Sequence, residues 1–359
     1  MGEHPKPTWT LRVEDDLSRE TADAIGAFMV QFNPGGDVRR SHSGDYYHWK
    51  LSRGPFGKGF VSLAMDGDTI AGATTVTRKR IHWNGRVVDA AEIGDTFVDS
   101  NYRRQGIFGS LVKATRERAR AAGVKLFYGT PNDQSLPGYE RKLDFPAHPT
   151  MDIKGWVVPI RLGSVASRSE RGSPLGPLTP LVDPISAGLI ARLPVGGGGC
   201  VHVPLTFGED YGRMNSLLTD RTSNFLDRSP EWLHHRYVDN PDHPRYGLVE
   251  HRRLGKLKGF LVYKTSQEEK GRMLWVADLV AANPLVEREL WVEAVRHGAR
   301  LGCDLLASWG PRTSALSRLP YLPLVAKDTP VIWWKDGEGQ AMLDDRGPWS
   351  FSIACSDNI

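Results

Sequence analysis

The stretch NYRRQGIFGSL, residues 101–111, contains residue types that could bind an anion. Two arginines and a glutamine precede Gly106, and the amphipathic stretch LVKATRERARAAG follows without a turn signal. This composition is unusual for a helix start, because glycine is a poor helix former and cations there oppose the helix dipole. Free backbone amides at a helix start can hold a phosphate, and glycine allows its close approach. The stretch therefore slightly favours an anion site over a loop that only joins a strand to a helix.

The overall composition is that of a soluble protein with well-packed cores. The 359 residues are 40% hydrophobic and 25% charged, which is ordinary for globular domains. The net charge of +4 is the small difference between 46 basic and 42 acidic residues. This balance argues against a dedicated nucleic-acid-binding protein, and it is compatible with a polyanionic small ligand.

The cysteines and the amino-terminal sequence predict a cytoplasmic protein. Cys200, Cys303 and Cys355 are far apart and form no CxxC pair, so neither a zinc site nor a disulfide framework is predicted. The first residues contain no apolar core of a secretory signal, and no apolar run reaches membrane-spanning length. We expect no membrane association and no bound metal.

Two structured regions flank a segment rich in proline, glycine and serine. Sequence patterns predict, in order, a strand at 8–13, a helix at 20–32, strands joined by turns within 59–98, a helix after Gly106 and a strand at 124–130. Asn84–Gly85 is a strong signal for a type I′ hairpin. Residues 161–184 and 194–200 are typical of a linker, with room for one short helix, ISAGLIARL. Beyond them the patterns predict strands at 258–264, 273–281 and 303–309 and a helix at 287–302.

The two structured regions repeat each other. SGDYYHWKL at 43–51 aligns with SPEWLHHRY at 229–237, an offset of 186 residues. A hairpin, an apolar strand, a helix and a short strand follow each copy in the same order, which indicates internal duplication. We expect domains at 1–160 and 201–359, joined by a linker at 161–200.

The first half resembles a GNAT acyltransferase, a member of the GCN5-related N-acetyltransferase superfamily. The resemblance lies in AAEIGDTFVDSNYRRQGIFGSL (90–111) and LFYGTPNDQSLPGYERKLDF (126–145). Residues 103–107 fit the family motif Gln/Arg-x-x-Gly-x-Gly/Ala, but Phe108 stands at the second small position and Gly109 follows it. The whole chain is similar to tandem GNAT proteins, which implies an α/β fold of two twisted mixed sheets flanked by helices.

The resemblance implies one acyl-CoA site, in the first half. The loop amides would cradle the pyrophosphate, the arginines would add hydrogen bonds, and the strand 96–98 would pair with the pantetheine arm. The implied binding residues are Thr96, Phe97, Val98, Arg103, Arg104, Gln105, Gly106, Ile107, Phe108, Gly109 and Asn132. The second half reads AANPLVERELW (281–291) at the same place. It has no glycine there, and Glu287 and Glu289 would repel a pyrophosphate, so we expect a degenerate second domain that shapes the acceptor pocket.

Acid and base candidates lie on the strand before the loop and shortly after Asn132. An amine nucleophile is mostly protonated at pH 7, so a base is needed. Glu92 is the first candidate and Asp95 the second. Strict alternation places Glu92 with Gly94 and Thr96 on one face, and Asp95 with Ile93 and Phe97 on the other. Tyr139 is equally compatible with protonating the thiolate and with packing as a buried aromatic.

Other polar groups are predicted to be structural or to line the acceptor pocket. His48, His234 and His235 lie in the repeated segment without the carboxylate or cysteine neighbours that a metal site needs. The carboxylate of Ile359 could serve as a base near the site, although a frayed terminus is the better expectation.

These observations and the resemblance together predict an acyl-CoA-dependent N-acyltransferase whose co-substrate is acetyl-CoA or another acyl-CoA. The expected acceptor is a primary amine of a small molecule such as an amino sugar, an antibiotic or a biosynthetic intermediate. A catalytically silent acyl-CoA sensor or scaffold is the alternative, and acetylation of RNA or protein lysine is less favoured. We expect a monomer or a homodimer.

Overall fold

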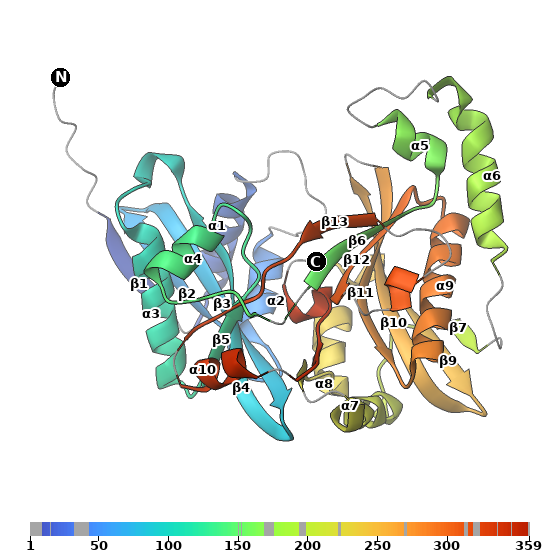
Figure 1. Ribbon diagram of the computed structural model, residues 1–359. Coiled ribbons are helices and arrows are strands. Elements are labelled where there is room, and N and C mark those ends of the chain that lie inside the picture. Colours follow the sequence, from blue (N-terminus) through green and yellow to red (C-terminus); the bar gives the residue numbers. More distant parts are fainter. Residues whose placement is uncertain are drawn as a thin grey trace. The chain divides into compact units, whose positions relative to one another are not determined.

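The computed structural model describes most of the chain as two compact units. The described residues are 9–14, 16–31, 43–149, 151, 153–168, 176–193, 199–221, 224–268, 271–311, 315–318, 324–335, 337–345 and 347–357. Those within 9–151 and 330–347 form the first unit, and those within 153–329 and 348–357 form the second. Each unit holds a mixed sheet flanked by helices (Figure 1), so the predicted α/β class is confirmed. The predicted boundaries at 160 and 200 stay predictions.

The first unit is built on a sheet with the order β1-β2-β3-β4-β5-β14. Its elements are β1 (Thr10–Glu14), α1 (Arg19–Val30), α2 (Gly44–Ser52), β2 (Phe60–Asp66), β3 (Thr69–Trp83), β4 (Arg86–Val98), α3 (Ile107–Ala121), β5 (Leu126–Gly129), α4 (Leu136–Lys142), β14 (Ile332–Trp333) and α10 (Glu338–Asp344). The strands β4 and β5 pair in parallel, and α3 connects them. The strand β14 comes from the carboxyl-terminal part of the chain and pairs with β5.

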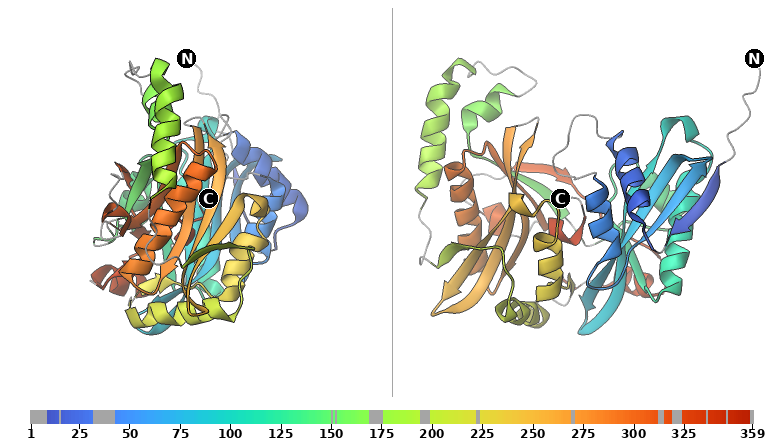
Figure 2. Two further views of the ribbon diagram at one scale, coloured as in Figure 1. Left: turned by 90° about the vertical axis from the view of Figure 1, so that its right-hand side faces the viewer. Right: turned by 180° about the vertical axis from the view of Figure 1, so that it is seen from behind.

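Helices cover both faces of this sheet (Figure 2). One buried cluster joins α1 and α2 to β2 and β3, and another joins α3 and α4 to β4 and β5. The predicted hairpin between β3 and β4 is confirmed, because Asn84 and Gly85 have φ of 47° and 74°, as a type I′ turn requires.

The second unit holds a sheet with the order β13-β6-β12-β11-β10-β9-β7. Its elements are β6 (Ile153–Pro159), α5 (Leu162–Ser167), α6 (Thr179–Ala191), β7 (Cys200–Val203), α7 (Glu209–Arg221), β8 (Asn224–Leu226), α8 (Pro230–Leu233), β9 (Tyr246–Arg253), β10 (Lys256–Glu268), β11 (Gly271–Ala281), α9 (Pro284–Arg300), β12 (Leu305–Pro311), β13 (Leu324–Asp328) and β15 (Trp349–Ser350). The long helix α9 packs on the sheet through Leu290, Trp291 and Val295.

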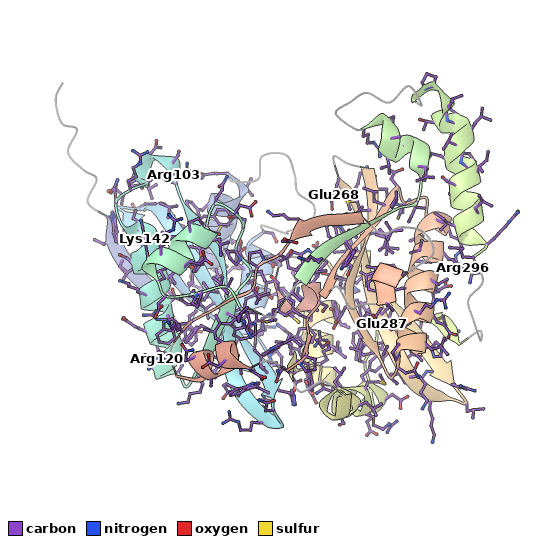
Figure 3. All side chains as sticks on the ribbon, viewed as in Figure 1. Arg103, Arg120, Lys142, Glu268, Glu287 and Arg296 are labelled. Atoms are coloured by element: carbon purple, nitrogen blue, oxygen red, sulfur yellow. The ribbon has the colours of Figure 1, made fainter. Side chains whose placement is uncertain are left out.

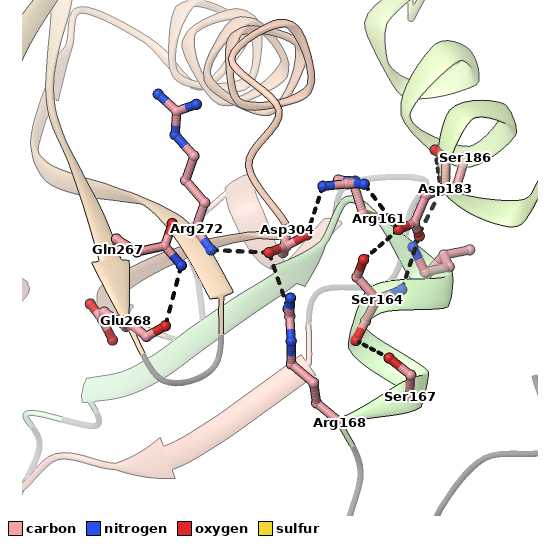
Figure 4. Close-up of polar contacts among 11 residues, drawn as sticks. Arg161, Ser164, Ser167, Arg168, Asp183, Ser186, Gln267, Glu268, Arg272 and Asp304 are labelled. Atoms are coloured by element: carbon pink, nitrogen blue, oxygen red, sulfur yellow. Dashed lines mark hydrogen bonds and ion pairs between the residues drawn. The ribbon is translucent and has the colours of Figure 1, made fainter. Parts of the chain in front are cut away.

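The segment 161–200, predicted as a linker, carries α5 and α6. Ala187 and Ile190 of α6 pack against the cluster around α9. Buried Asp183 accepts hydrogen bonds from Ser164, and Arg161 lies 3.3 Å from both Asp183 and Asp304 (Figure 4). Burial acts against ionisation of Asp183, yet the Ser164 hydrogen bonds and the Arg161 charge lower its pKa overall.

The duplicated segments begin with the same helix cap. Ser43 accepts a hydrogen bond from the Tyr46 amide, and Ser229 accepts one from the Trp232 amide. Both pairs keep the offset of 186 residues seen in the sequence. Serine at this position satisfies an amide that the helix itself leaves unbonded. Among the residues that the structure describes, none of the helices is both long enough and apolar enough to span a bilayer.

Candidate active site

The helix α3 begins with a glycine instead of a capping side chain. Gly106 has φ of 80°, and no side chain of the described chain caps the helix start. A Cβ on Gly106 would meet no atom within 4 Å, so space lies open beside the residue. The first turn contains no acidic residue, and Arg103 and Arg104 precede it, both exposed. Figure 3 shows Arg103 near this end of α3 and Arg120 near the other. Open space, a positive helix end and two cations fit a phosphate group.

Phe108 packs against α4. Its ring makes an edge-on contact with Tyr139, with the centroids 5.0 Å apart. A Cβ on Gly138 would lie only 3.0 Å from the Phe108 ring, so α4 approaches this ring closely because residue 138 has no side chain. The nearest atom to a Cβ on Gly109 would be Leu143 Cδ2, at 3.9 Å. Phe108 therefore fills the space between α3 and α4, which explains how a large residue fits at this motif position.

The remaining predicted binding residues of this region differ in burial and in their contacts. Gln105 is half-buried. Ile107 is buried in a cluster with Ala64, Ala71 and Leu111, and this packing fixes the first turn of α3 on the sheet. Asn132 is exposed, and its Oδ1 accepts hydrogen bonds from the backbone of Gln134 and Ser135 before α4. The Asn132 side chain thus shapes the turn that precedes α4.

The end of β4 extends past its neighbour β5. Their parallel ladder runs from Ala90 and Leu126 to Glu92 and Tyr128. The strand β5 ends at Gly129, whereas β4 continues to Val98. Residues 96–98 are half-buried. An extended arm with amide groups can bind beside such a strand end by backbone hydrogen bonds.

A bulge interrupts this part of β4. The pairs Ala73–Phe97 and Thr75–Gly94 enclose two steps along β3 but three along β4, so β4 carries one extra residue. Asp95 lies in the bulge with φ of 45°, a left-handed conformation that costs free energy for a residue other than glycine. An extra residue shifts the alternation of side chains beyond it.

The faces of β4 predicted by strict alternation are therefore wrong. Ile93 packs in the cluster with α3 and α4, whereas Phe97 packs against α1 and α2, although alternation places both on one face. Thr96 reaches α4, where its Oγ1 lies 3.0 Å from the Tyr139 hydroxyl. Asp95 contacts α2 instead, so it does not share the face of Ile93.

Each candidate base is contacted by a buried lysine that sequence reasoning missed. Lys50 Nζ of α2 lies 2.6 Å from Asp95 Oδ2, and the two side chains are 1% and 6% exposed. Lys79 Nζ of β3 lies 3.5 Å from Glu92 Oε2, and both of these side chains are buried too. The sequence contained one signal for Lys50. A lysine within the aromatic segment YYHWKL is expected to be buried, and a buried lysine requires a partner.

Tyr139 is packed as a buried aromatic, and its hydroxyl reaches β4. Its ring is buried among Phe108 and Phe145, while its hydroxyl contacts Thr96 Oγ1, which lies 2.6 Å from Thr74 Oγ1. Burial raises the pKa of Tyr139 to about 12, so its phenol is neutral at physiological pH. A neutral phenol can donate a proton.

The histidines of the repeated segment lie on α2 and directly after α8. His48 is half-buried on α2. His234 and His235 both approach Asp239, with nitrogen-to-oxygen distances of 3.4 and 4.0 Å. Within the described ranges, no three His, Cys, Asp or Glu side chains are grouped as a metal site requires. Ile359 lies outside the described residues.

The corresponding helix start in the second unit is closed. Asn283 Oδ1 caps α9 by accepting from the Val286 amide, and Pro284 has no amide hydrogen to offer. Glu287 accepts a hydrogen bond from the Ala315 amide. Glu289 does not face the helix start as expected, because it is buried 2.5 Å from His251 Nε2. This end of α9 lacks the open glycine start of α3.

Comparisons with known proteins agree with this architecture. Two family models, both described as an acetyltransferase (GNAT) domain, match residues 20–145 and 225–300. Together they cover more than half of the chain. No match was found among curated protein sequences.

Solved structures share the fold at low sequence identity. A GCN5-related N-acetyltransferase from Anabaena variabilis is 15% identical with a TM-score of 0.60, covering 90% of this chain and 72% of its own. One from Kribbella flavida is 16% identical with a TM-score of 0.54, covering 91% and 71%. N-myristoyltransferase from Saccharomyces cerevisiae, solved with bound myristoyl-CoA, is 13% identical with a TM-score of 0.61, covering 93% and 84%. The chain thus belongs to the GNAT superfamily, as a tandem protein with one GNAT domain in each half.

Proposed function

We propose that this protein is an acyl-CoA-dependent N-acyltransferase that uses acetyl-CoA and acts on a primary amine of a small molecule. Amino sugars, antibiotics and biosynthetic intermediates are the acceptor classes we favour. The observation that carries the proposal is the start of α3, where Gly106 adopts φ of 80° beside open space. One solved neighbour also supports an acyl-CoA as the donor, because the N-myristoyltransferase structure contains bound myristoyl-CoA.

The donor would bind along α3 and the end of β4. The amides of residues 104–109 would hold the pyrophosphate, and Arg103 and Arg104 would add charge-assisted hydrogen bonds. Residues 96–98 would pair with the pantetheine amides, which places the thioester near the β4 bulge. Asn132 would act through the turn before α4 that it stabilises.

The reaction would be direct attack of the amine nitrogen on the thioester carbonyl carbon. The C–S bond then breaks, the amine loses a proton, and the CoA thiolate gains one. Glu92 is our first candidate for the base, acting directly or through water, and Asp95 is the second. Tyr139 is the candidate acid, since its hydroxyl is protonated and adjoins Thr96 of β4.

A catalytically silent acyl-CoA sensor is the second candidate function. Its support is the burial of both carboxylates against lysines, which would limit their access to an amine. Acetylation of RNA or of protein lysine is less favoured, because the basic runs of the chain are more simply explained as solvated surface. For all of these functions we propose a cytoplasmic monomer or homodimer.

We also propose that each chain binds one donor. The capped start of α9, with Pro284 and Glu287 in its first turn, supports a degenerate second domain whose role is to shape the acceptor pocket.

Calorimetric titration of acetyl-CoA into the full chain tests the proposal. We expect one site in the wild type and loss of binding in Gly106→Trp, because the indole would occupy the space left for the phosphate. Gly123→Trp is the matched control, since Gly123 also has positive φ with no atom near its Cβ position, at the opposite end of α3. Equal loss in both variants would indicate unfolding, which the thermal midpoint reports. Failure of the wild type to bind any acyl-CoA would refute the proposed function.

Turnover separates the two candidate functions. A panel of small amines with acetyl-CoA should yield an acylated product and free thiol. Tight binding without turnover on a broad panel would favour the sensor.

A further inference from the structure

The Lys50–Asp95 ion pair joins two features that the proposed function does not explain. Asp95 is a strained residue in the bulge of β4, and Lys50 is a nearly fully buried lysine near the end of α2. Removing two charges from water is unfavourable unless close contact between them offsets the lost hydration. The position of this pair, between α2 and the β4 bulge, is therefore the feature to explain.

The backbone around the pair is arranged to admit the lysine. A Cβ on Gly94 would lie 3.6 Å from Lys50 Nζ, so residues 94 and 95 both approach the same ammonium from β4. Lys50 Nζ also lies 5.8 Å from the centre of the Tyr46 ring, on the same helix. The ammonium is thus fixed by α2 on one side and by the bulge on the other.

The bulge in turn decides where the next side chain points. Thr96 lies directly after Asp95, and its hydroxyl reaches Tyr139 at 3.0 Å and Thr74 at 2.6 Å. Without the extra residue, alternation would place Thr96 on the opposite face, away from Tyr139.

We propose that Lys50 and Asp95 are positioning residues for acyl transfer. Their ion pair holds the β4 bulge, and the bulge directs Thr96 toward Tyr139 and shapes the strand end beside which the donor binds. The inference rests on the proposed function. It makes Asp95 a residue that acts through the backbone, and Glu92 stays the first candidate for the base.

The kinetic test compares single variants that lose the ion pair with a double variant in which glycine at position 95 keeps the bulge conformation. Lys50→Met should lower kcat/KM about 100-fold, because a small displacement of reacting groups is enough for such a loss. Asp95→Gly alone removes the carboxylate that lies 2.6 Å from the buried Lys50 ammonium, and it should also lose activity. The double variant Lys50→Met/Asp95→Gly should recover most of the activity, since glycine adopts positive φ without help from an ion pair.

A matched control and the pH profile separate this role from others. Lys58 lies 2.6 Å from Asp16, as Lys50 does from Asp95, but that pair is exposed, so Lys58→Met should leave kcat and KM unchanged. If Asp95 were the base, the double variant would stay inactive, and the acid limb of the wild-type kcat/KM profile, which reports the ionisation of an essential base, would be missing from any residual activity of Asp95→Gly. If the pair were only structural, Lys50→Met would lower the thermal midpoint while kcat and KM of the folded protein stayed at wild-type values. Either result overturns the inference.

Hydrogen exchange in the ligand-free protein tests the inference independently of whether the protein binds acetyl-CoA. The amides of residues 96–98 should exchange faster in Lys50→Met than in wild type, and at the wild-type rate in the double variant. Unchanged exchange in Lys50→Met would contradict the positioning role, whether or not the wild type binds acetyl-CoA.

Discussion

The Tyr139 hydroxyl lies 3.0 Å from Thr96 Oγ1, which links α4 to the strand segment where the donor is proposed to bind. The ring of Tyr139 is buried against Phe108 and Phe145, so the hydroxyl has one well-defined direction. Thr74 Oγ1 lies 2.6 Å from Thr96 Oγ1. The three hydroxyl groups form a chain that connects β3, β4 and α4.

Removing the hydroxyl should slow turnover without weakening donor binding. We expect Tyr139→Phe to lower kcat by about 100-fold, the low end for a general acid, because a thiolate also leaves without protonation. The KM for acetyl-CoA should stay unchanged. Tyr211→Phe is the control, since the hydroxyl of that buried tyrosine contacts Glu250 in the second unit. A kcat equal to wild type would exclude Tyr139 as the acid.

The stability that the Tyr139 phenol contributes should decrease at alkaline pH. Burial raises the pKa of Tyr139 to about 12 from the ordinary 10.0, so the folded protein keeps the phenol neutral where an unfolded chain would begin to ionise. Stability from this group is complete below about pH 10 and is lost as the pH rises toward 12. Denaturant unfolding across this range should show a smaller alkaline loss in Tyr139→Phe than in wild type.

The His297 imidazole should control stability on the acid side. Burial lowers the pKa of His297 to about 4, and His202 and Arg300 act in the same direction, while Glu293 opposes them. Tyr263 faces the ring too, with its hydroxyl 2.9 Å from Nε2.

Folded His297 therefore stays neutral while the unfolded chain takes up a proton below about pH 6.5. Stability from this group is complete above that pH and is lost as the pH falls toward 4. Thermal midpoints measured across this range should fall less in His297→Gln than in wild type. His234→Gln, at an exposed position, should follow the wild-type curve, and identical curves for all three proteins would contradict the assignment.

A buried ion pair ties the carboxyl-terminal segment to the second unit. Arg236 Nη1 lies 3.0 Å from Asp357 Oδ1, and Arg236 also donates to the Ser356 carbonyl. Arg236→Met should lower the free energy of unfolding by about 3–5 kcal/mol, because it removes the cation from a buried ion pair and leaves the Asp357 charge buried. Arg213→Met, which breaks an exposed pair with Asp210, should cost less than about 1 kcal/mol. Equal effects in chemical denaturation would show that the Arg236 pair is no stronger than a surface pair.

The cap of α9 should affect stability but not donor binding. Asn283→Ala removes the acceptor of the Val286 amide and should destabilise the protein by about 1 kcal/mol. Acetyl-CoA stoichiometry should remain one per chain, since Pro284 and Glu287 still occupy the first turn. Appearance of a second site in calorimetry would mean that the cap alone keeps this helix start closed.

Local patterns in the sequence determined several of the elements and the candidate donor loop. The helix after Gly106 and the Asn84–Gly85 hairpin depend on neighbours within a few residues. Backbone conformation at such places follows from residue type, so sequence alone is sufficient. The family resemblance depended on the same local patterns.

Contacts between distant residues were decided only by the tertiary structure. The bulge at Asp95 shifts the alternation of β4, and no local signal marks it, because it depends on how β4 pairs with β3 and on a lysine 45 residues away. The large Phe108 at a small motif position is accommodated because Gly138, on another helix, leaves room for the ring. Glu289, expected at the helix start, instead pairs with His251 across the fold. Burial and charge pairing depend on the whole packed chain, so the sequence supplies the groups and only the packed structure decides which of them meet.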